Sequence, residues 1–124
     1  MEKTRILVVD DEQTVRLLVR RFLSDKFAVL EASDGEEAVD MARKHKPALI
    51  LMDIMMPNMD GYNACHAIKT DEATKAIPVV MLTAVGYELN KKLAESVGAD
   101  GYITKPFALE KLLDTIGKFV EILK

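Results

Sequence analysis

Short apolar runs alternate with longer amphipathic segments along the whole chain. The apolar runs are rich in branched aliphatic side chains, which is typical of strands in a buried sheet. We expect strands over residues 5–9, 27–32, 48–53, 79–83 and 102–105. In the segments between and after these runs, apolar residues recur three or four positions apart, which is typical of helices with one buried face. We expect helices over residues 15–23, 33–44, 61–70, 90–97 and 109–123.

The first two runs differ in a way that predicts their places in the sheet. Residues 5–9 (RILVV) show no polar alternation, so both faces of this strand are expected to be buried, as in a central strand. Residues 27–32 (FAVLEA) are more mixed, so this strand is expected at an edge. Strands that alternate with helices predict a parallel sheet covered by helices on both faces, which is an α/β fold of the doubly wound type.

The first and last helices have the clearest apolar stripes. In the first helix the expected buried residues are Val15, Leu18, Val19, Phe22 and Leu23. The residues expected to point away from the core are Arg16, Arg20 and Arg21. The stripe of the last helix, which is expected to run almost to the C-terminus, consists of Leu109, Leu112, Leu113, Ile116, Val120 and Leu123.

Polar residues and glycines predict where the other helices begin and end. Ser33 and Glu36 form a capping-box pattern at the start of the second helix, and basic residues 43–46 are expected at its end. Asp60 is suited to cap the third helix. Residues 84–89 have the character of a loop. The glycine-containing segment 98–101 is expected to end the fourth helix.

Length and composition indicate one globular domain. At 124 residues, with 49% apolar and 30% charged residues, we expect a single domain over residues 1–124 without an effector domain. The apolar runs are far shorter than the ~18 residues of a membrane helix, and the N-terminus leads into a strand rather than a signal peptide. The single cysteine, Cys65, cannot form an intramolecular disulfide and fits a reducing compartment. We expect a cytoplasmic protein that no membrane anchors.

The charge balance disfavours a nucleic-acid-binding surface. The net charge is −3, whereas nucleic-acid-binding domains usually carry a basic excess on one face. The two histidines, His45 and His66, fall on expected helices and are interpreted as ordinary helix residues rather than catalysts.

Polar residues stand where four of the apolar runs end. Asp10 and Asp11 follow the first run, Asp53 ends the third, and Thr83 and Lys105 end the fourth and fifth. Ligands of open α/β sheets bind outside the carboxyl ends of the strands, so these groups are expected at one edge of the sheet. Three carboxylates, a hydroxyl and an ammonium group are suited to a divalent cation together with a phosphoryl group.

Each of these residues alone has a simpler explanation. Asp10 or Asp11 could cap the following helix, Lys105 could be a solvated lysine, and Thr83 could be an ordinary strand residue. The agreement of all the strand ends favours a shared site. Three nearby methionines keep two interpretations, either apolar cover of the loop or restriction of water at the acceptor, and they are Met55, Met56 and Met59.

The ordered set of motifs resembles the receiver domains of two-component response regulators, the chemotaxis-regulator-like family. The matching motifs are Asp10-Asp11, Leu51-Met52-Asp53-Ile54-Met55-Met56-Pro57 with Asp60-Gly61, Leu82-Thr83-Ala84, Gly98-Ala99-Asp100-Gly101-Tyr102 and Lys105-Pro106-Phe107. The resemblance covers the chain from end to end. It implies a flavodoxin-like, five-stranded parallel sheet in the order 2-1-3-4-5 with helices on both faces, so strands one and three lie side by side.

By this resemblance Asp53 is the residue that is phosphorylated, by a sensor histidine kinase or a histidine phosphotransfer protein. Asp11 and Asp53 bind Mg²⁺ together with the backbone carbonyl of Met55, and Asp10 acts mostly through a metal-bound water. The physical chemistry agrees, because three carboxylates in one cleft repel each other and a hard dication with oxygen ligands removes that conflict.

The resemblance also implies a switch. Thr83 and Lys105 contact the phosphoryl oxygens, and Tyr102 turns inward when Thr83 moves. The expected output surface is formed by the fourth helix, the fifth strand and the fifth helix. Its candidate partner-contacting residues are Lys91, Lys92, Tyr102, Lys111 and Lys118.

The expected function is therefore a phospho-accepting signalling module rather than an enzyme, with self-phosphorylation and slow self-dephosphorylation. Slow hydrolysis is expected because Met55 and Val85, near the approach of water, are apolar. The downstream protein target is not identified, and either a monomer or a phosphorylation-dependent dimer is compatible with the sequence.

Two other classes fit the residues less well. A phosphohydrolase with an aspartyl-phosphate would need an Asp-x-Asp pattern, but Ile54 and Met55 follow Asp53. A flavodoxin-like flavin binder would need a phosphate-binding loop after the first strand, where residues 10–12 (DDE) would instead repel an anion.

Overall fold

The protein is built on a parallel five-stranded sheet in the order β2-β1-β3-β4-β5. The strands are β1 (Thr4–Val9), β2 (Phe27–Ala32), β3 (Leu49–Asp53), β4 (Val79–Thr83) and β5 (Gly101–Thr104). The computed structural model describes residues 3–83 and 88–121, and for Thr83 and residues 88–91 it describes the backbone alone. The expected α/β class and the expected strand order are both confirmed.

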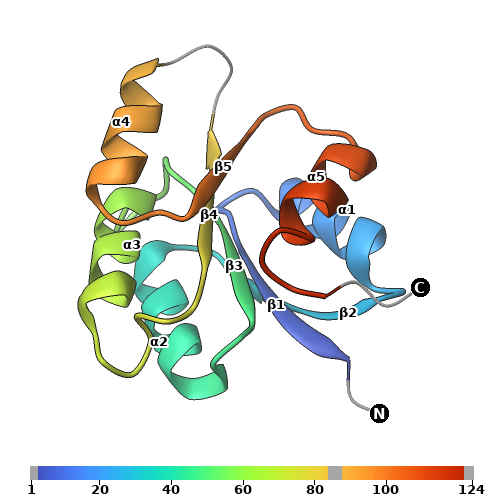
Figure 1. Ribbon diagram of the computed structural model, residues 1–124, viewed down its shortest axis with the longest axis horizontal. Helices are drawn as coiled ribbons and strands as arrows, with labels where there is room; N and C mark the ends of the chain where they lie inside the picture. The colour runs from blue at the N-terminus through green and yellow to red at the C-terminus, as the bar shows by residue number, and fades with distance from the viewer. Residues whose placement is uncertain (1–2, 84–87, 122–124) are drawn as a thin grey trace.

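Helices cover both faces of the sheet (Figure 1). They are α1 (Gln13–Leu23), α2 (Gly35–His45), α3 (Gly61–Thr70), α4 (Glu88–Ser96) and α5 (Leu109–Ile116). α1 and α5 lie on one face, and α2, α3 and α4 lie on the other (Figure 1). Within the described ranges, no helix combines the length and the apolarity that crossing a bilayer requires.

Two apolar clusters, one on each face of the sheet, form the core. β1 and β3 contribute to both, because successive side chains of a strand point to opposite faces. Leu7 and Ile50 belong to the cluster beneath α2, α3 and α4, whereas Ile6 and Leu49 belong to the cluster beneath α1 and α5. All of β3 is buried, and β1 lies between β2 and β3 with its last four residues fully buried. The expected central position of β1 and edge position of β2 are confirmed.

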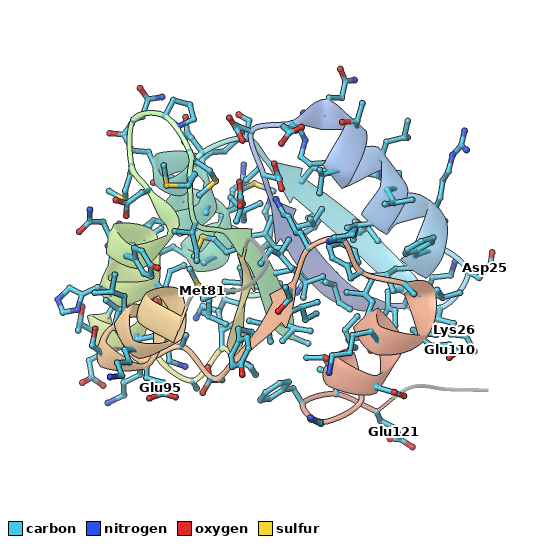
Figure 2. The ribbon with its side chains drawn as sticks, turned by 90° about the horizontal axis from the view of Figure 1, so that it is seen from above. Asp25, Lys26, Met81, Glu95, Glu110 and Glu121 are labelled. Atoms are coloured by element: carbon cyan, nitrogen blue, oxygen red, sulfur yellow. The ribbon has the colours of Figure 1, made fainter. Side chains whose placement is uncertain are left out.

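Many charged side chains lie at the periphery, whereas Asp10 and Asp53 are buried. Viewed from above, Met81 of β4 lies in the interior, whereas Asp25, Lys26, Glu95, Glu110 and Glu121 lie at the periphery (Figure 2). The cysteine of α3, Cys65, is fully buried, and its thiol Sγ lies 3.7 Å from the carbonyl oxygen of Val97. Burial raises the pKa of the Cys65 thiol to about 11.

The outward face of α1 was predicted only in part. Val19 and Leu23 are buried as expected, but Leu18 is 41% exposed. Arg16 does not point away from the fold, because its Nε donates to Glu31 of β2 at 3.1 Å. Arg20 donates to the same carboxylate at 2.9 Å. The expectation for Arg16 and Arg20 was wrong because α1 lies along the edge strand, where the Glu31 carboxylate replaces water as the partner of both guanidinium groups.

The cap of α2 lies one residue later than expected. Asp34, not Ser33, accepts the N–H of Glu37 at 2.9 Å, and the Glu37 carboxylate accepts the N–H of Ser33 at 2.6 Å. The reason is a close approach at Gly35, whose N–H donates to the carbonyl of Met59 at 3.0 Å. A Cβ on Gly35 would lie 2.4 Å from that oxygen, so only glycine fits at the first position of the helix, directly after the Asp34 cap.

The other boundary signals acted as expected. The carboxylate of Asp60 accepts the N–H of Asn63 at 2.8 Å at the start of α3. α2 ends within the basic cluster, at His45, with Lys46 in the left-handed region at a φ of 44°. Gly98 follows α4 with a φ of 89°, and the N–H of Ala99 reaches back to the carbonyl of Ala94 at 3.0 Å.

α4 and β5 begin earlier than expected. α4 starts at Glu88, so part of the segment expected to be a loop is helical, and residues 84–87 lie outside the described residues. β5 runs from Gly101 to Thr104, which leaves Lys105 just beyond the strand rather than within it. A sheet ladder of four pairs, from Val80↔Gly101 to Thr83↔Thr104, sets these bounds.

The expectation that the last helix runs almost to the terminus was wrong. α5 ends at Ile116, and the N–H groups of Phe119 and Val120 both donate to the Ile116 carbonyl at 3.0 Å. Gly117, a weak helix former, follows at once. Val120 of the predicted stripe still packs against the core beneath α1 and α5, as does Phe119, which the stripe did not include. Leu109 of the stripe is 39% exposed, and Leu123 lies outside the described residues.

Candidate functional site

The residue after β1, Asp10, is held firmly at the carboxyl edge of the sheet. Its side chain is fully buried, and one carboxylate oxygen accepts the N–H of Glu12 at 2.9 Å. Its own N–H donates to the carbonyl of Ala32 at 3.1 Å, and its carbonyl accepts from Arg16 at 2.6 Å. Backbone and side-chain bonds together fix the direction of this carboxylate.

Three of the expected site residues meet at this edge. Asp53, the last residue of β3, is 8% exposed, and the Lys105 Nζ lies 3.1 Å from its Oδ1. The same Nζ lies 3.0 Å from the Oδ2 of Asp10. They converge because β1 and β3 are neighbours, with Val9 paired to Met52, and the chain leaves β5 at the same edge. Residues separated by up to 95 positions in the sequence are thereby joined.

An acidic cluster adjoins the triad of Asp10, Asp53 and Lys105. The carboxylate oxygens of Asp10, Asp11 and Glu12 lie within 4.8 Å of one another, and the last two side chains are exposed. Such hard oxygen donors suit Mg²⁺, which keeps several of its waters and takes few protein ligands. Asp53 is not a member of this cluster but is connected to it through Lys105.

Glu12 was not assigned a role from the sequence. The only signal for it is its place directly after two aspartates, and that place is equally typical of a helix start. The structure shows it preceding the first residue of α1 without a side-chain cap bond, so its carboxylate remains available to the acidic cluster.

The charges of the triad are unevenly balanced. Burial and then the charge of Asp10 raise the pKa of Asp53, against the opposing effect of Lys105. Burial lowers the pKa of Lys105, but its hydrogen bonds and charge interactions with both aspartates outweigh this and raise it overall. The ammonium is therefore charged at neutral pH, and it offsets part of the repulsion between the two carboxylates.

The loop after Asp53 is closed by a glycine. The N–H of Gly61 donates to the carbonyl of Ile54 at 2.8 Å, and a Cβ on Gly61 would lie 2.2 Å from the Asp53 carbonyl oxygen. Met55, whose carbonyl was expected to bind the metal, has a side chain that is 78% exposed. Met56 and Met59 pack against the apolar cluster beneath α2, α3 and α4, which favours the interpretation of these two methionines as apolar cover of the loop.

The remaining expected residues lie on β4 and β5 or on and beside the helices α4 and α5. Thr83 ends β4 directly after Leu82, which is paired with Asp53, so the Thr83 backbone lies at the same edge of the sheet. The Thr83 hydroxyl, Val85 and the Lys91 side chain lie outside the described residues. Tyr102 is 36% exposed and makes an interaction of its own. With Lys111 and Lys118 it lines an open hollow of about 560 Å³ between β5 and α5. Lys92 is exposed on α4.

Comparison with known proteins gives a consistent result. The family model described as "Response regulator receiver domain" matches residues 6–117. The chain is 42% identical over 113 residues to the chemotaxis protein CheY of Halobacterium salinarum, and the matched region covers 90% of this chain and 92% of that protein. It spans less than half the length of several other curated relatives, which are described as probable transcriptional regulators.

Solved structures agree with the fold. Chemotaxis protein CheY4 of Vibrio cholerae has a TM-score of 0.89 and 34% identity, over 95% of this chain and 99% of that one. The receiver domain of the sensor histidine kinase PA1611 of Pseudomonas aeruginosa has a TM-score of 0.88 and 27% identity, over 94% and 97% of the two chains. That structure has a magnesium ion coordinated in its active site cleft.

Proposed function

Because the chain belongs to the response regulator receiver domain family and so to phosphorylation-based two-component signalling, we propose that Asp53 is its phosphoryl acceptor. The observation that carries the proposal is the Lys105 ammonium, which bonds to both Asp53 and Asp10 at the carboxyl edge of the sheet. A cation placed there can neutralise oxygens of a phosphoryl group attached to Asp53.

The reaction requires one oxygen of Asp53 to attack the phosphorus of a phosphohistidine. As the new oxygen–phosphorus bond forms, the bond between phosphorus and the imidazole nitrogen breaks, and that nitrogen keeps the electron pair. Lys105 is positioned to move its hydrogen bond from the Asp53 oxygen to a phosphoryl oxygen, while Asp10 retains its other bond to the ammonium. The donor would be a sensor histidine kinase or a histidine phosphotransfer protein.

The acidic cluster fits a magnesium ion. Asp10 and Asp11, together with Asp53 and the carbonyl of Met55, would hold the ion, and Glu12 offers a further carboxylate within reach of the first two. When bound, Mg²⁺ would neutralise charge on the phosphoryl oxygens. The support is chemical: the described donors are all oxygens, and three of them lie within 4.8 Å of one another.

The output would use the face formed by α4, β5 and α5. Thr83 would contact the phosphoryl group, and the half-exposed ring of Tyr102 would change its packing in response. Lys111 and Lys118, which border the hollow beside Tyr102, are the cations placed to contact a protein partner. We propose that this signalling takes place in the cytoplasm and that the phosphoryl group is lost slowly by hydrolysis.

Incubation with acetyl phosphate and Mg²⁺ tests the proposal. We expect intact-mass spectra to show one added phosphoryl group on the wild type and none on Asp53→Ala. Asp40→Ala, an exposed carboxylate on α2, is the matched control and should label like the wild type. Equal labelling of Asp53→Ala would contradict the assignment of the acceptor.

A further inference from the structure

The loop between β3 and α3, residues 54–60, has internal bonds that shape it. The N–H of Gly61 donates to the Ile54 carbonyl at 2.8 Å, and the N–H of Met59 donates to the Pro57 carbonyl at 2.7 Å. Asn58, in the middle of the loop, has a φ of 65°, in the left-handed region that asparagine tolerates better than most residues. The loop is therefore a specific conformation rather than a slack connection.

The same loop is bonded to the N-terminus of α2. The N–H of Gly35 donates to the carbonyl of Met59 at 3.0 Å, and the amide nitrogen of Asn58 donates to Oδ2 of Asp34 at 2.8 Å. Oδ1 of Asp34 accepts the N–H of Glu37 at 2.9 Å. The carboxylate of Asp34 thus connects two elements, since one oxygen caps α2 and the other accepts a hydrogen bond from the β3–α3 loop.

Met55 lies in the loop between the buried Ile54 and Met56, which packs against the apolar cluster, and it precedes the bonded residues 58 and 59. Its side chain is 78% exposed and so adds little packing, whereas Met59 packs against the apolar cluster and is bonded to Gly35. Between the end of β3 and that anchor, the Asn58 amide provides a bond to the rest of the fold. Its donor meets a charged acceptor, and charge-assisted hydrogen bonds are stronger than neutral ones.

We propose that Asp34 and Asn58 are positioning residues for the magnesium site: they hold the β3–α3 loop so that the Met55 carbonyl faces the acidic cluster. This inference rests on the proposed function, which assigns that carbonyl to the metal. The two residues touch neither the metal nor the phosphoryl group and act only through the backbone of the loop.

One substitution separates positioning from electrostatics. Asn58→Asp keeps the size of the side chain and the tolerance of a positive φ, but it sets a second carboxylate against Asp34. Electrostatics alone predicts tighter Mg²⁺ binding, because a negative charge is added near a cation site. Positioning predicts weaker binding, because the bond is replaced by repulsion.

The double variant D34N/N58D restores the bond in reverse. The amide at position 34 can cap α2 through its oxygen and donate its nitrogen to the carboxylate at position 58, and the net charge equals that of the wild type. Asn63→Asp, at an exposed site in the first turn of α3, is the matched control, because it adds the same charge without a bond to α2.

The experiment is a Mg²⁺ titration of the ¹⁵N-labelled protein followed by NMR, with the metal-free spectrum as the check of folding. We expect about three- to tenfold weaker binding for Asn58→Asp, the effect of losing one hydrogen bond that supports a metal ligand. We expect D34N/N58D to lie within about twofold of the wild type, and Asn63→Asp to bind at least as tightly as the wild type. Asn58→Gly, which keeps the positive φ without the bond, should also bind more weakly.

Each other result has a definite meaning. If Asn58→Asp binds Mg²⁺ as tightly as the wild type, or if D34N/N58D stays as weak as the single variant, the positioning role is wrong while the proposed function stands. If the wild type itself does not respond to Mg²⁺, the proposed metal site and this inference both fail.

Discussion

At the scale of single residues, the site depends on one ammonium group shared by two carboxylates. The Asp10 side chain is fully buried, that of Asp53 is 11% exposed, and that of Lys105 is 25% exposed. Buried carboxylates without a partner are strongly unfavourable, so the cation that we propose as a phosphoryl contact should also stabilise the metal-free fold.

Lys105→Met should therefore destabilise the metal-free protein at neutral pH. We expect a loss of about 1–3 kcal/mol in the free energy of unfolding, because two buried like charges remain without their cation. Lys75→Met, which removes a surface lysine paired with Glu72, is the control and should change stability by about 0–1 kcal/mol.

The destabilisation should depend on pH. The pKa of Asp53 is already raised in the folded protein and should rise further without Lys105. A carboxyl group whose folded pKa is raised favours the folded state when protonated, so the stability of Lys105→Met should fall as pH rises through that pKa. Urea denaturation in a chelator at pH 5 and pH 8 measures this, and an equal deficit at both pH values would contradict the account.

At the scale of elements, α3 approaches the end of β3 so closely that no side chain fits at its first residue, beside the Asp53 backbone. The first residue of α3 is Gly61, and a Cβ there would meet the backbone of both Asp53 and Ile54 within 3 Å. Backbone atoms cannot move aside as a flexible side chain can, so a larger residue must displace the start of the helix and the loop before it.

Gly61→Ala should thus lower the free energy of unfolding by about 2–3 kcal/mol and reduce the phosphorylation rate. Gly101→Ala is the matched control, because the nearest atom to its Cβ position is a carbon of the Phe119 ring at 3.5 Å, an ordinary contact. Denaturation midpoints and labelling rates of both variants make the comparison. If Gly61→Ala retains wild-type stability, the backbone near Asp53 is more compliant than the structure indicates.

Elements also show what the sequence could and could not predict. The sequence could predict that three site residues, Asp10, Asp53 and Lys105, lie close together, because periodicity reveals the strands and the carboxyl ends of parallel strands lie at one edge of the sheet. The contact of Arg16 with Glu31 could not be predicted, since it depends on how α1 lies along an edge strand.

The other errors have similar causes. The cap of α2 moved from Ser33 to Asp34 because of contact between Gly35 and Met59, which are far apart in sequence. α5 ended early because Phe119 gains packing against the core without helical geometry. Local patterns indicated most of the buried residues, although Leu18 and Leu109 are exposed, and long-range contacts decide where an element stops.

At the scale of the whole molecule, the proposed metal site would couple metal binding to folding. A ligand that binds only the native state adds RT ln(1 + [L]/Kd) to the free energy of unfolding. Asp10, Asp11 and Glu12 are consecutive in the sequence, so the donors that unfolding would separate from them are the proposed ligands Asp53 and the Met55 carbonyl, which lie at and after the end of β3.

Mg²⁺ should accordingly raise the melting temperature at neutral pH. At ten times Kd we expect a gain of about 1.4 kcal/mol, which Asp11→Ala should abolish. Asp25→Ala, at an exposed carboxylate between α1 and β2, should keep the full gain. Differential scanning calorimetry with and without Mg²⁺ checks this, and a wild-type melting temperature insensitive to Mg²⁺ would contradict the metal site.

The buried thiol of Cys65 has a practical consequence for site-specific labelling. It is the chain's single cysteine, its side chain is fully buried, and its pKa is about 11, so almost none of it is the reactive thiolate at neutral pH. Alkylating dyes and spin labels should therefore leave the native chain unmodified. A cysteine introduced at an exposed position, such as Met55→Cys beside the proposed acceptor Asp53, would then carry the only probe, without prior removal of the natural thiol.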